Sequence, residues 1–237
     1  MTRLEHKIAL IVKHKLPCYF ISSHLGDAMT SSGDLILYLA RKTKVTVITV
    51  FTEADKKPYT SVVKKFLFSC RYEDAEELFA SQQVRDKDAC SSAGVSAIHL
   101  GLIDGKWRKK RNNGFFGKIL GSYIPELIHL YPFGKAIGGV LAHGDKEIVH
   151  QVQKRLLSVI HEKQDFVVFS PLGRIPYMDQ MLTLDVCLTS FPHVIFWKGL
   201  SSDVHEKDYD LFLKNLDLKR YVWDKHKTKE ENSEFFI

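Results

Sequence analysis

Short runs of consecutive apolar residues alternate along the chain with longer stretches in which apolar residues recur every three or four positions. Runs of the first kind predict buried strands, and spacings of the second kind predict amphipathic helices. The predicted strands are residues 17–23, 44–51, 97–102, 166–169 and 193–197, and the predicted helices are residues 32–43, 72–93, 147–163 and 181–189. Because strands and helices alternate, we expect an α/β fold with a mostly parallel, Rossmann-like sheet flanked by helices.

The alternation is interrupted by neither repeats nor a low-complexity linker, so residues 1–237 are expected to form a single domain. Residues 115–142 depart from the pattern, because they are aromatic, punctuated by glycine and only partly periodic. They predict a pair of short packed helices or, alternatively, a lid over an active-site mouth or an interfacial or dimer-forming surface. A homo-oligomer is therefore one possible assembly. The polar stretch 225–234 predicts a surface segment or a frayed tail.

The composition is that of an ordinary folded protein, with 45% apolar and 26% charged residues. No apolar run approaches the roughly 20 residues that cross a bilayer, so no transmembrane segment is expected. The opening stretch is broken by charges and does not resemble a signal peptide. Four widely spaced cysteines form no CxxC pair, and reduced core thiols of this kind predict a cytoplasmic location.

The net charge is +6, and much of the excess lies in the basic run at residues 106–111. Such a run is typical either of a solvated loop or of a surface that meets phosphate, nucleic acid or an anionic membrane. The sequence contains no helix-turn-helix, zinc-finger or RNA-binding signature. Nucleic acid is therefore not an expected partner.

Candidate chemistry falls in two loops, residues 22–28 and 170–180, each of which follows a predicted strand. Ligands of open α/β sheets bind at the carboxyl ends of the strands, where such loops meet. His24 and Asp27 are three residues apart, so an imidazole and a carboxylate can converge there as half of a zinc site. The alternative is structural, with Asp27 capping the next helix. The first loop contains no GxGxxG cradle, which disfavours a nucleotide-binding Rossmann protein.

Residues 21–36 (ISSHLGDAMTSSGDLI) resemble the signature of the PIG-L/LmbE deacetylase family, in which a strand ends in His-Pro-Asp-Asp or His-Leu-Asp-Asp before a helix. The resemblance extends along nearly the whole chain. It is carried by VTVITVF (residues 45–51), RDKDA (85–89), HLGLIDGKWR (99–108), FSPLG (169–173) and the terminal EFF (234–236).

The resemblance implies a zinc-dependent hydrolase that removes acetyl from an N-acetylated amino sugar or glycoconjugate. From the first motif, it implies His24 and Asp27 as zinc ligands. Arg85 and Asp104 are implied as substrate-binding residues. The position of the family's general base is occupied by Gly26, which cannot accept a proton.

The family's second motif, His-x-Asp-His, matches residues 177–180. Gln180 takes the place of the third zinc ligand, and Tyr177 takes the place of the histidine that stabilises the oxyanion, where its hydroxyl can still donate a hydrogen bond. Asp179 alone is retained, so Tyr177 and Asp179 are the candidate catalytic residues. A neutral amide is a poor zinc ligand, and a positioned base is worth about 10²–10⁴ in rate. The alternative hypothesis is an inactive relative that serves as a sugar- or partner-binding module.

Overall fold

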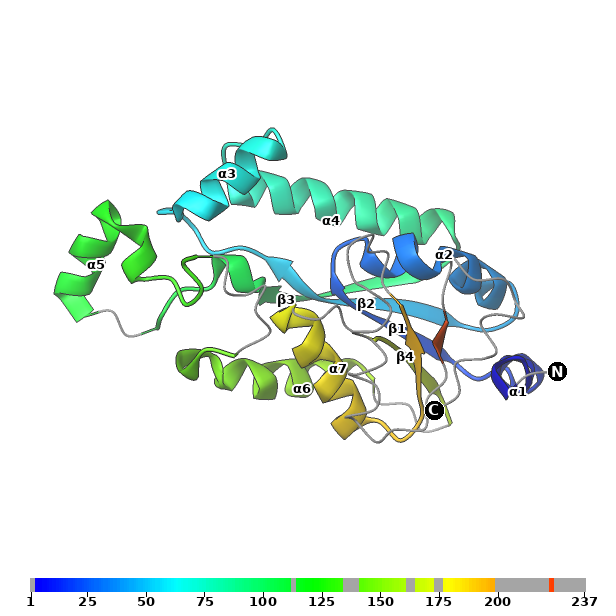
Figure 1. Cartoon of the computed structure of the whole chain (residues 1–237). Helices are drawn as coiled ribbons and strands as arrows, with labels where there is room; N and C mark the ends of the chain where they lie inside the picture. Colours follow the sequence, from blue (N-terminus) through cyan, green and yellow to red (C-terminus); the bar gives the residue numbers. More distant parts are fainter. Residues whose placement is uncertain are drawn as a thin grey trace.

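In the computed structural model, described for residues 3–111, 114–133, 141–160, 165–172, 177–198 and 222–223, a parallel sheet lies between two layers of helices (Figure 1). Its strands occur in the order β3-β2-β1-β4-β5-β6, and each neighbouring pair is parallel. The strands are β1 (Cys18–His24), β2 (Val45–Glu53), β3 (Ser96–Ile103), β4 (Val167–Pro171), β5 (Val194–Trp197) and β6 (Val222–Trp223). The strand order reverses between β1 and β4, and in such sheets ligands bind outside the carboxyl ends of the strands at this point.

Helices cover both faces of the sheet. Packing of their buried side chains places α1, α2 and α4 on one face and α6 and α7 on the other. The helices are α1 (Arg3–His14), α2 (Asp27–Ala40), α3 (Ser61–Ser69), α4 (Ala75–Ser92), α5 (Gly114–Tyr123), α6 (Glu147–Val159) and α7 (Met178–Ser190). The described part of the chain also contains short 3₁₀ helices, η1 (Gly105–Trp107), η2 (Pro125–Leu127) and η4 (His143–Asp145).

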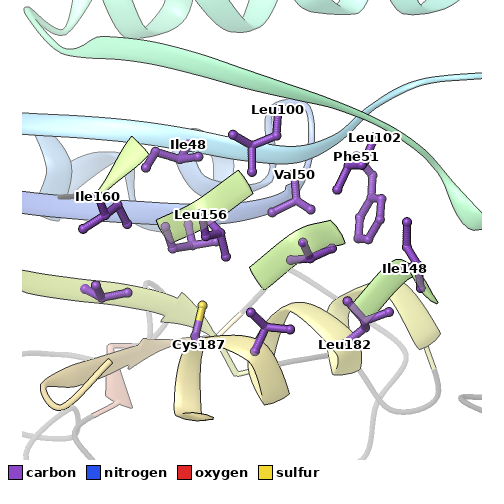
Figure 2. Close-up of a cluster of buried hydrophobic side chains, with 14 of the residues drawn as sticks. Ile48, Val50, Phe51, Leu100, Leu102, Ile148, Leu156, Ile160, Leu182 and Cys187 are labelled. Carbon is purple, nitrogen blue, oxygen red and sulfur yellow. The ribbon is translucent and has the colours of Figure 1, made fainter. Parts of the chain in front are cut away.

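The core on each face of the sheet follows from the two-residue period of the strands. On β1, Phe20 packs with α1 and α2, whereas its neighbour Ile21 packs with α6 and α7. Figure 2 shows the cluster on the face covered by α6 and α7, in which Leu156 of α6 lies toward Ile48 of β2, and Leu182 of α7 lies beside Ile148 of α6. Both faces of β1 and β2 are buried, which agrees with the apolar run at 17–23 and the β-branched run at 44–51 in the sequence.

The structure confirms the predicted α/β fold and departs from it in detail. The helix expected at 32–43 begins five residues earlier, at Asp27, and bends at Ser32, whose φ of −131° is not helical. Sequence patterning missed α1 and α3. Residues 115–142 contain α5 and η2, in agreement with short helices, while 134–140 and the polar stretch 225–234 lie outside the described residues. Within the described ranges, no helix has the length and apolar character needed to cross a bilayer.

Candidate metal and substrate site

A cavity of about 270 Å³ lies at the carboxyl ends of β1 and β3, where the two loops singled out from the sequence meet. Its walls include five of the seven site residues predicted from the sequence: His24, Asp27, Asp104, Tyr177 and Gln180. Asp179, the sixth, lies directly behind the cavity, with Oδ2 3.4 Å from Nε2 of His24. The fold therefore brings together residues that are 155 positions apart in the sequence.

Arg85 is the predicted residue that the structure does not bring to the cavity. It is exposed on α4, and the side chain that α4 contributes beside Leu78 and Phe79 is Gln82, one turn earlier. Successive residues of a helix point about 100° apart, so the side chains of two residues three positions apart point in directions that differ by about 60°. Gln82 is a cavity residue that the sequence reading missed.

The loop between β1 and α2 sets the geometry of His24 and Asp27. Gly26 adopts a left-handed conformation with φ of +83°, which glycine tolerates without strain. The Ser22 hydroxyl donates to the His24 carbonyl at 2.7 Å and accepts from the Ala28 amide at 3.2 Å. This short turn brings Nδ1 of His24 to 3.3 Å from Oδ2 of Asp27.

Asp86 of α4 holds the same loop from the side. Its Oδ1 accepts the Gly26 amide at 2.8 Å, and its Oδ2 lies 2.8 Å from Nε2 of His99 on β3. The carboxylate is buried, with 4% of the residue exposed. The sequence indicates that Asp86 is buried, because it lies four residues before Cys90 and therefore on the same buried face of α4, next to the exposed Arg85.

On the opposite side of His24, Asp179 is fixed by two donors. Its carboxylate accepts a hydrogen bond from the buried guanidinium of Arg108, and its Oδ2 accepts the Gly105 amide at 2.8 Å. This close approach favours glycine, because a Cβ at position 105 would lie 3.2 Å from both carboxylate oxygens, a tight contact. Arg108 also pairs with Asp145, which accepts the Tyr131 hydroxyl at 2.9 Å. Arg108, expected to belong to a basic surface run, is instead 4% exposed.

Asp104 completes the charged ring around His24. Its Oδ1 accepts the Lys106 amide at 2.8 Å at the start of η1, and its Oδ2 lies 3.6 Å from Nε2 of His24. The Asp104 side chain is 12% exposed and lines the cavity. It therefore both caps a local turn and presents a carboxylate oxygen to the site.

The carboxylates change the protonation of the groups around them. Burial lowers the pKa of His24, but its hydrogen bonds to Asp179 and Asp27 and the charge of Asp104 outweigh this effect, so the pKa lies well above the ordinary value. Burial raises the pKa of Asp179, and the charge of Arg108 together with His24 outweighs it, so Asp179 remains ionised. A metal ion bound at His24 would have to compete with the proton that these carboxylates favour on the ring.

Charge and spacing at the site both fit a divalent cation. Four carboxylates, from Asp27, Asp104, Asp145 and Asp179, surround two cationic side chains, Arg108 and His24. The 3.3 Å between Nδ1 of His24 and Oδ2 of Asp27 matches the edge of a tetrahedral zinc site, about 3.3 Å for bonds of about 2.0 Å. His24 and Asp27, together with Gln180 on the same cavity wall, could hold the metal ion.

A second ligand set is formed at the other nitrogen of the same ring. His24, Asp104 and Asp179 each offer a donor atom, and these atoms lie within 4.8 Å of one another. However, Asp179 is already engaged by Arg108 and Gly105. Metal-ligating histidines commonly give their other ring nitrogen to a carboxylate, which orients the ring. Asp27 and Asp179 thus lie at opposite ring nitrogens of His24, and of the two only Asp179 is also held by Arg108 and Gly105.

Replacing Asp86 with alanine is expected to weaken zinc binding about 10- to 100-fold, because the loop that aligns His24 and Asp27 loses its anchor. Competition with a chromogenic zinc chelator measures this affinity. Asp88→Ala, an exposed carboxylate on the same helix, is the matched control and should leave the affinity unchanged. Asp86→Asn retains an oxygen that can accept the Gly26 amide and should recover part of the loss. An Asp86→Ala protein that stays folded and binds zinc normally would contradict this role.

No protein-family model matches the sequence, and no curated protein matches it. Solved structures do match in fold. A deacetylase of the A40926 pseudoaglycone, called an antimicrobial reagent, is 21% identical over 81% of this chain and 69% of its own, with a TM-score of 0.58. A teicoplanin-pathway deacetylase in complex with teicoplanin is 22% identical over 83% and 72%, with a TM-score of 0.62. A zinc-inhibited teicoplanin deacetylase is 19% identical over 80% and 72%, with a TM-score of 0.61.

Proposed function

We propose that this chain, whose fold is that of the LmbE/PIG-L deacetylases, is a metal-dependent deacetylase of an N-acetylated amino sugar or glycoconjugate. The observation that carries the proposal is the environment of His24. One ring nitrogen faces Asp27 at the cavity, and the other faces Asp179, which is buried and clamped by Arg108. This is the arrangement in which proteins present an oriented imidazole to a metal ion.

Zinc is the proposed ion, held by His24, Asp27 and Gln180. When bound, it would supply Lewis acidity that polarises an acetamide carbonyl and acidifies water. Glutamine binds zinc less strongly than histidine, so the affinity should be lower than that of a site with two histidines. Tyr177, on the cavity wall, would donate a hydrogen bond to the developing oxyanion.

Asp104 is the proposed proton acceptor, in addition to its predicted contact with the sugar. Gly26 has no side chain that can accept a proton, and both oxygens of Asp179 already accept from protein donors. Asp104 keeps Oδ2 toward His24 and the cavity. The retained ring of His24, Asp27, Asp104 and Asp179 also favours an enzyme over an inactive binding module. The cytoplasmic location stays a prediction from the cysteines, which are free in the structure.

Metal analysis of the purified protein tests this proposal first. We expect about one zinc ion per chain by plasma mass spectrometry in the wild type, and none in His24→Ala, because the imidazole is shared by both possible ligand sets. Hydrolysis of N-acetylglucosamine conjugates, measured as the release of free amine, should be lost in the same variant. His150→Ala, an exposed histidine on α6, is the matched control.

Two outcomes would contradict the proposal in different ways. A wild-type protein that takes up no divalent metal, even from added zinc, would exclude the metal-dependent mechanism. A protein that binds zinc through His24 yet releases no amine from any acetylated sugar would instead support a binding module, with the metal retained as a structural or ligand-recognition element.

A further inference from the structure

Exposed large apolar side chains gather at one end of the molecule. Of the twelve such residues in the described part of the chain, eight belong to α3, α5 or residues 124–133. The most exposed are Phe68 at 85%, Tyr123 at 82% and Phe133 at 70%, and the others are Val62, Ile119, Leu120, Ile124 and Leu127. Figure 1 shows α5 projecting from this end, away from the α2 end of the sheet. Clustered apolar exposure of this kind marks interaction surfaces.

The apolar residues form one surface because α3 and the α5–η2 segment are in contact. Phe68 of α3 and Tyr123 of α5 line the same cavity of about 530 Å³, together with Tyr72 and Pro125. The Ser61 amide and hydroxyl at the start of α3 both donate to Glu126 of η2 at 2.9 Å. We call these residues, from α3, α5 and 124–133, the apolar end surface.

Basic residues are interleaved with the apolar end surface. The Lys110 amide donates to the Ile128 carbonyl at 2.8 Å, and its ammonium donates to the Leu127 carbonyl at 2.9 Å. Lys64, on α3, lines the cavity between Phe68 and Tyr123. Apart from the buried Arg108, residues 55–74 and 104–133 together contain ten Lys and Arg but five Asp and Glu.

Helix α3 contributes side chains both to the apolar end surface and to the cavity of the candidate site. Phe66 lines that cavity, whereas Phe68, two positions on and about 200° around the helix, belongs to the apolar end surface. Lys106, from the basic run, also lines the cavity, with its ammonium 4.3 Å from the centre of the Phe66 ring. The apolar end surface and the cavity therefore lie on different sides of α3.

We propose that the apolar end surface docks the protein onto a bilayer that contains anionic phospholipids. Exposed aromatic side chains that can enter the headgroup region, ringed by lysines that meet negative headgroups, are the two features of interfacial membrane binding. Binding to nucleic acid would explain the lysines, but it would leave the aliphatic side chains of α5 and η2 exposed to water. A second copy of the chain accounts for the apolar residues, but it would bring two surfaces of like charge together. The proposal does not depend on the deacetylase function, since it concerns a different surface.

Co-sedimentation of the full chain with vesicles tests the proposal. We expect binding to vesicles of phosphatidylcholine and phosphatidylglycerol (7:3), and at least tenfold weaker binding to phosphatidylcholine alone or in 0.5 M NaCl. The double variant Phe68→Ser, Tyr123→Ser should lower the partition coefficient about tenfold or more. Lys64→Gln with Lys65→Gln should lower it on the order of tenfold. The matched control is Leu37→Ser with Tyr38→Ser, two exposed apolar residues of α2, which should bind as the wild type does.

Four results would overturn the proposal. The first is an absence of binding to anionic vesicles by folded wild-type protein. The second is binding that Phe68→Ser, Tyr123→Ser leaves unchanged. The third is concentration-dependent dimerisation, measured by sedimentation velocity, that this variant abolishes, since that result assigns the surface to a second copy. Tighter binding to a single-stranded oligonucleotide than to vesicles would assign the lysines to nucleic acid. None of these results bears on metal content, so failure here leaves the proposed function intact.

Discussion

Replacing Arg108 with methionine is expected to lower the free energy of unfolding by about 3–5 kcal/mol at pH 7, measured by urea denaturation. The guanidinium is buried and pairs with both Asp145 and Asp179, which are themselves 6% and 5% exposed. Methionine fills much of the same volume but leaves two carboxylates in the interior without their shared cation. A buried charge that loses its partner costs far more than the pair contributes.

Arg111→Met provides the matched control for this prediction. Arg111 belongs to the same basic run, but its side chain is 67% exposed and 4.0 Å from Glu147, itself 65% exposed. Exposed pairs of this kind contribute about 0–1 kcal/mol, so the control should unfold nearly as the wild type does. Adding Asp145→Asn to Arg108→Met should recover part of the loss, because one uncompensated charge is removed. A loss below 1 kcal/mol in Arg108→Met would show that these carboxylates are compensated in another way.

The fold was predictable because its strands are buried on both faces. β1, β2 and β4 are buried at nearly every position, so their sequences do not show the apolar–polar alternation of a strand with one exposed face. The two helices that patterning missed differ in their packing. α1 carries charges at many positions, although its Leu4 and Ile11 pack in the core on one face of the sheet. α3 packs chiefly in a separate cluster around Trp107. Local pattern therefore identified the strands of the sheet and missed one helix that covers it and one that packs away from it.

The candidate site was predictable only as far as it follows from sheet topology. His24 ends β1, and Gln180 lies in the first turn of α7, which follows the neighbouring strand β4, so their meeting follows from the strand order. The partners of Arg108 lie 37 and 71 residues away, and no local pattern shows that a cation within a basic run turns inward. Whether α4 presents Gln82 or Arg85 depends on one turn of helix register, which amphipathic spacing alone does not fix.

Introducing the carboxylate base and the third histidine ligand of the family motifs, with Gly26→Asp and Gln180→His, is expected to raise the rate of amino-sugar deacetylation by about 10²–10⁴-fold. A Cβ at Gly26 would meet no atom within 4 Å, so an aspartate has room beside Asp27. The left-handed backbone costs a non-glycine residue about 1–2 kcal/mol, and aspartate is among the residues that tolerate it best. Histidine at position 180, on the same cavity wall, would add an imidazole to the ligands already offered by His24 and Asp27.

Gly26→Asn with Gln180→His separates the base from the ligand in this experiment. Asparagine adopts the same left-handed conformation as aspartate but does not accept a proton at neutral pH. This control should bind zinc as tightly as the aspartate variant does, while its rate stays near that of Gln180→His alone. Equal rates in the two double variants would show that a carboxylate at position 26 is not needed. Asp104, which keeps an oxygen directed at the site, would then be the sufficient proton acceptor, and Asp104→Asn should abolish activity in the wild-type chain.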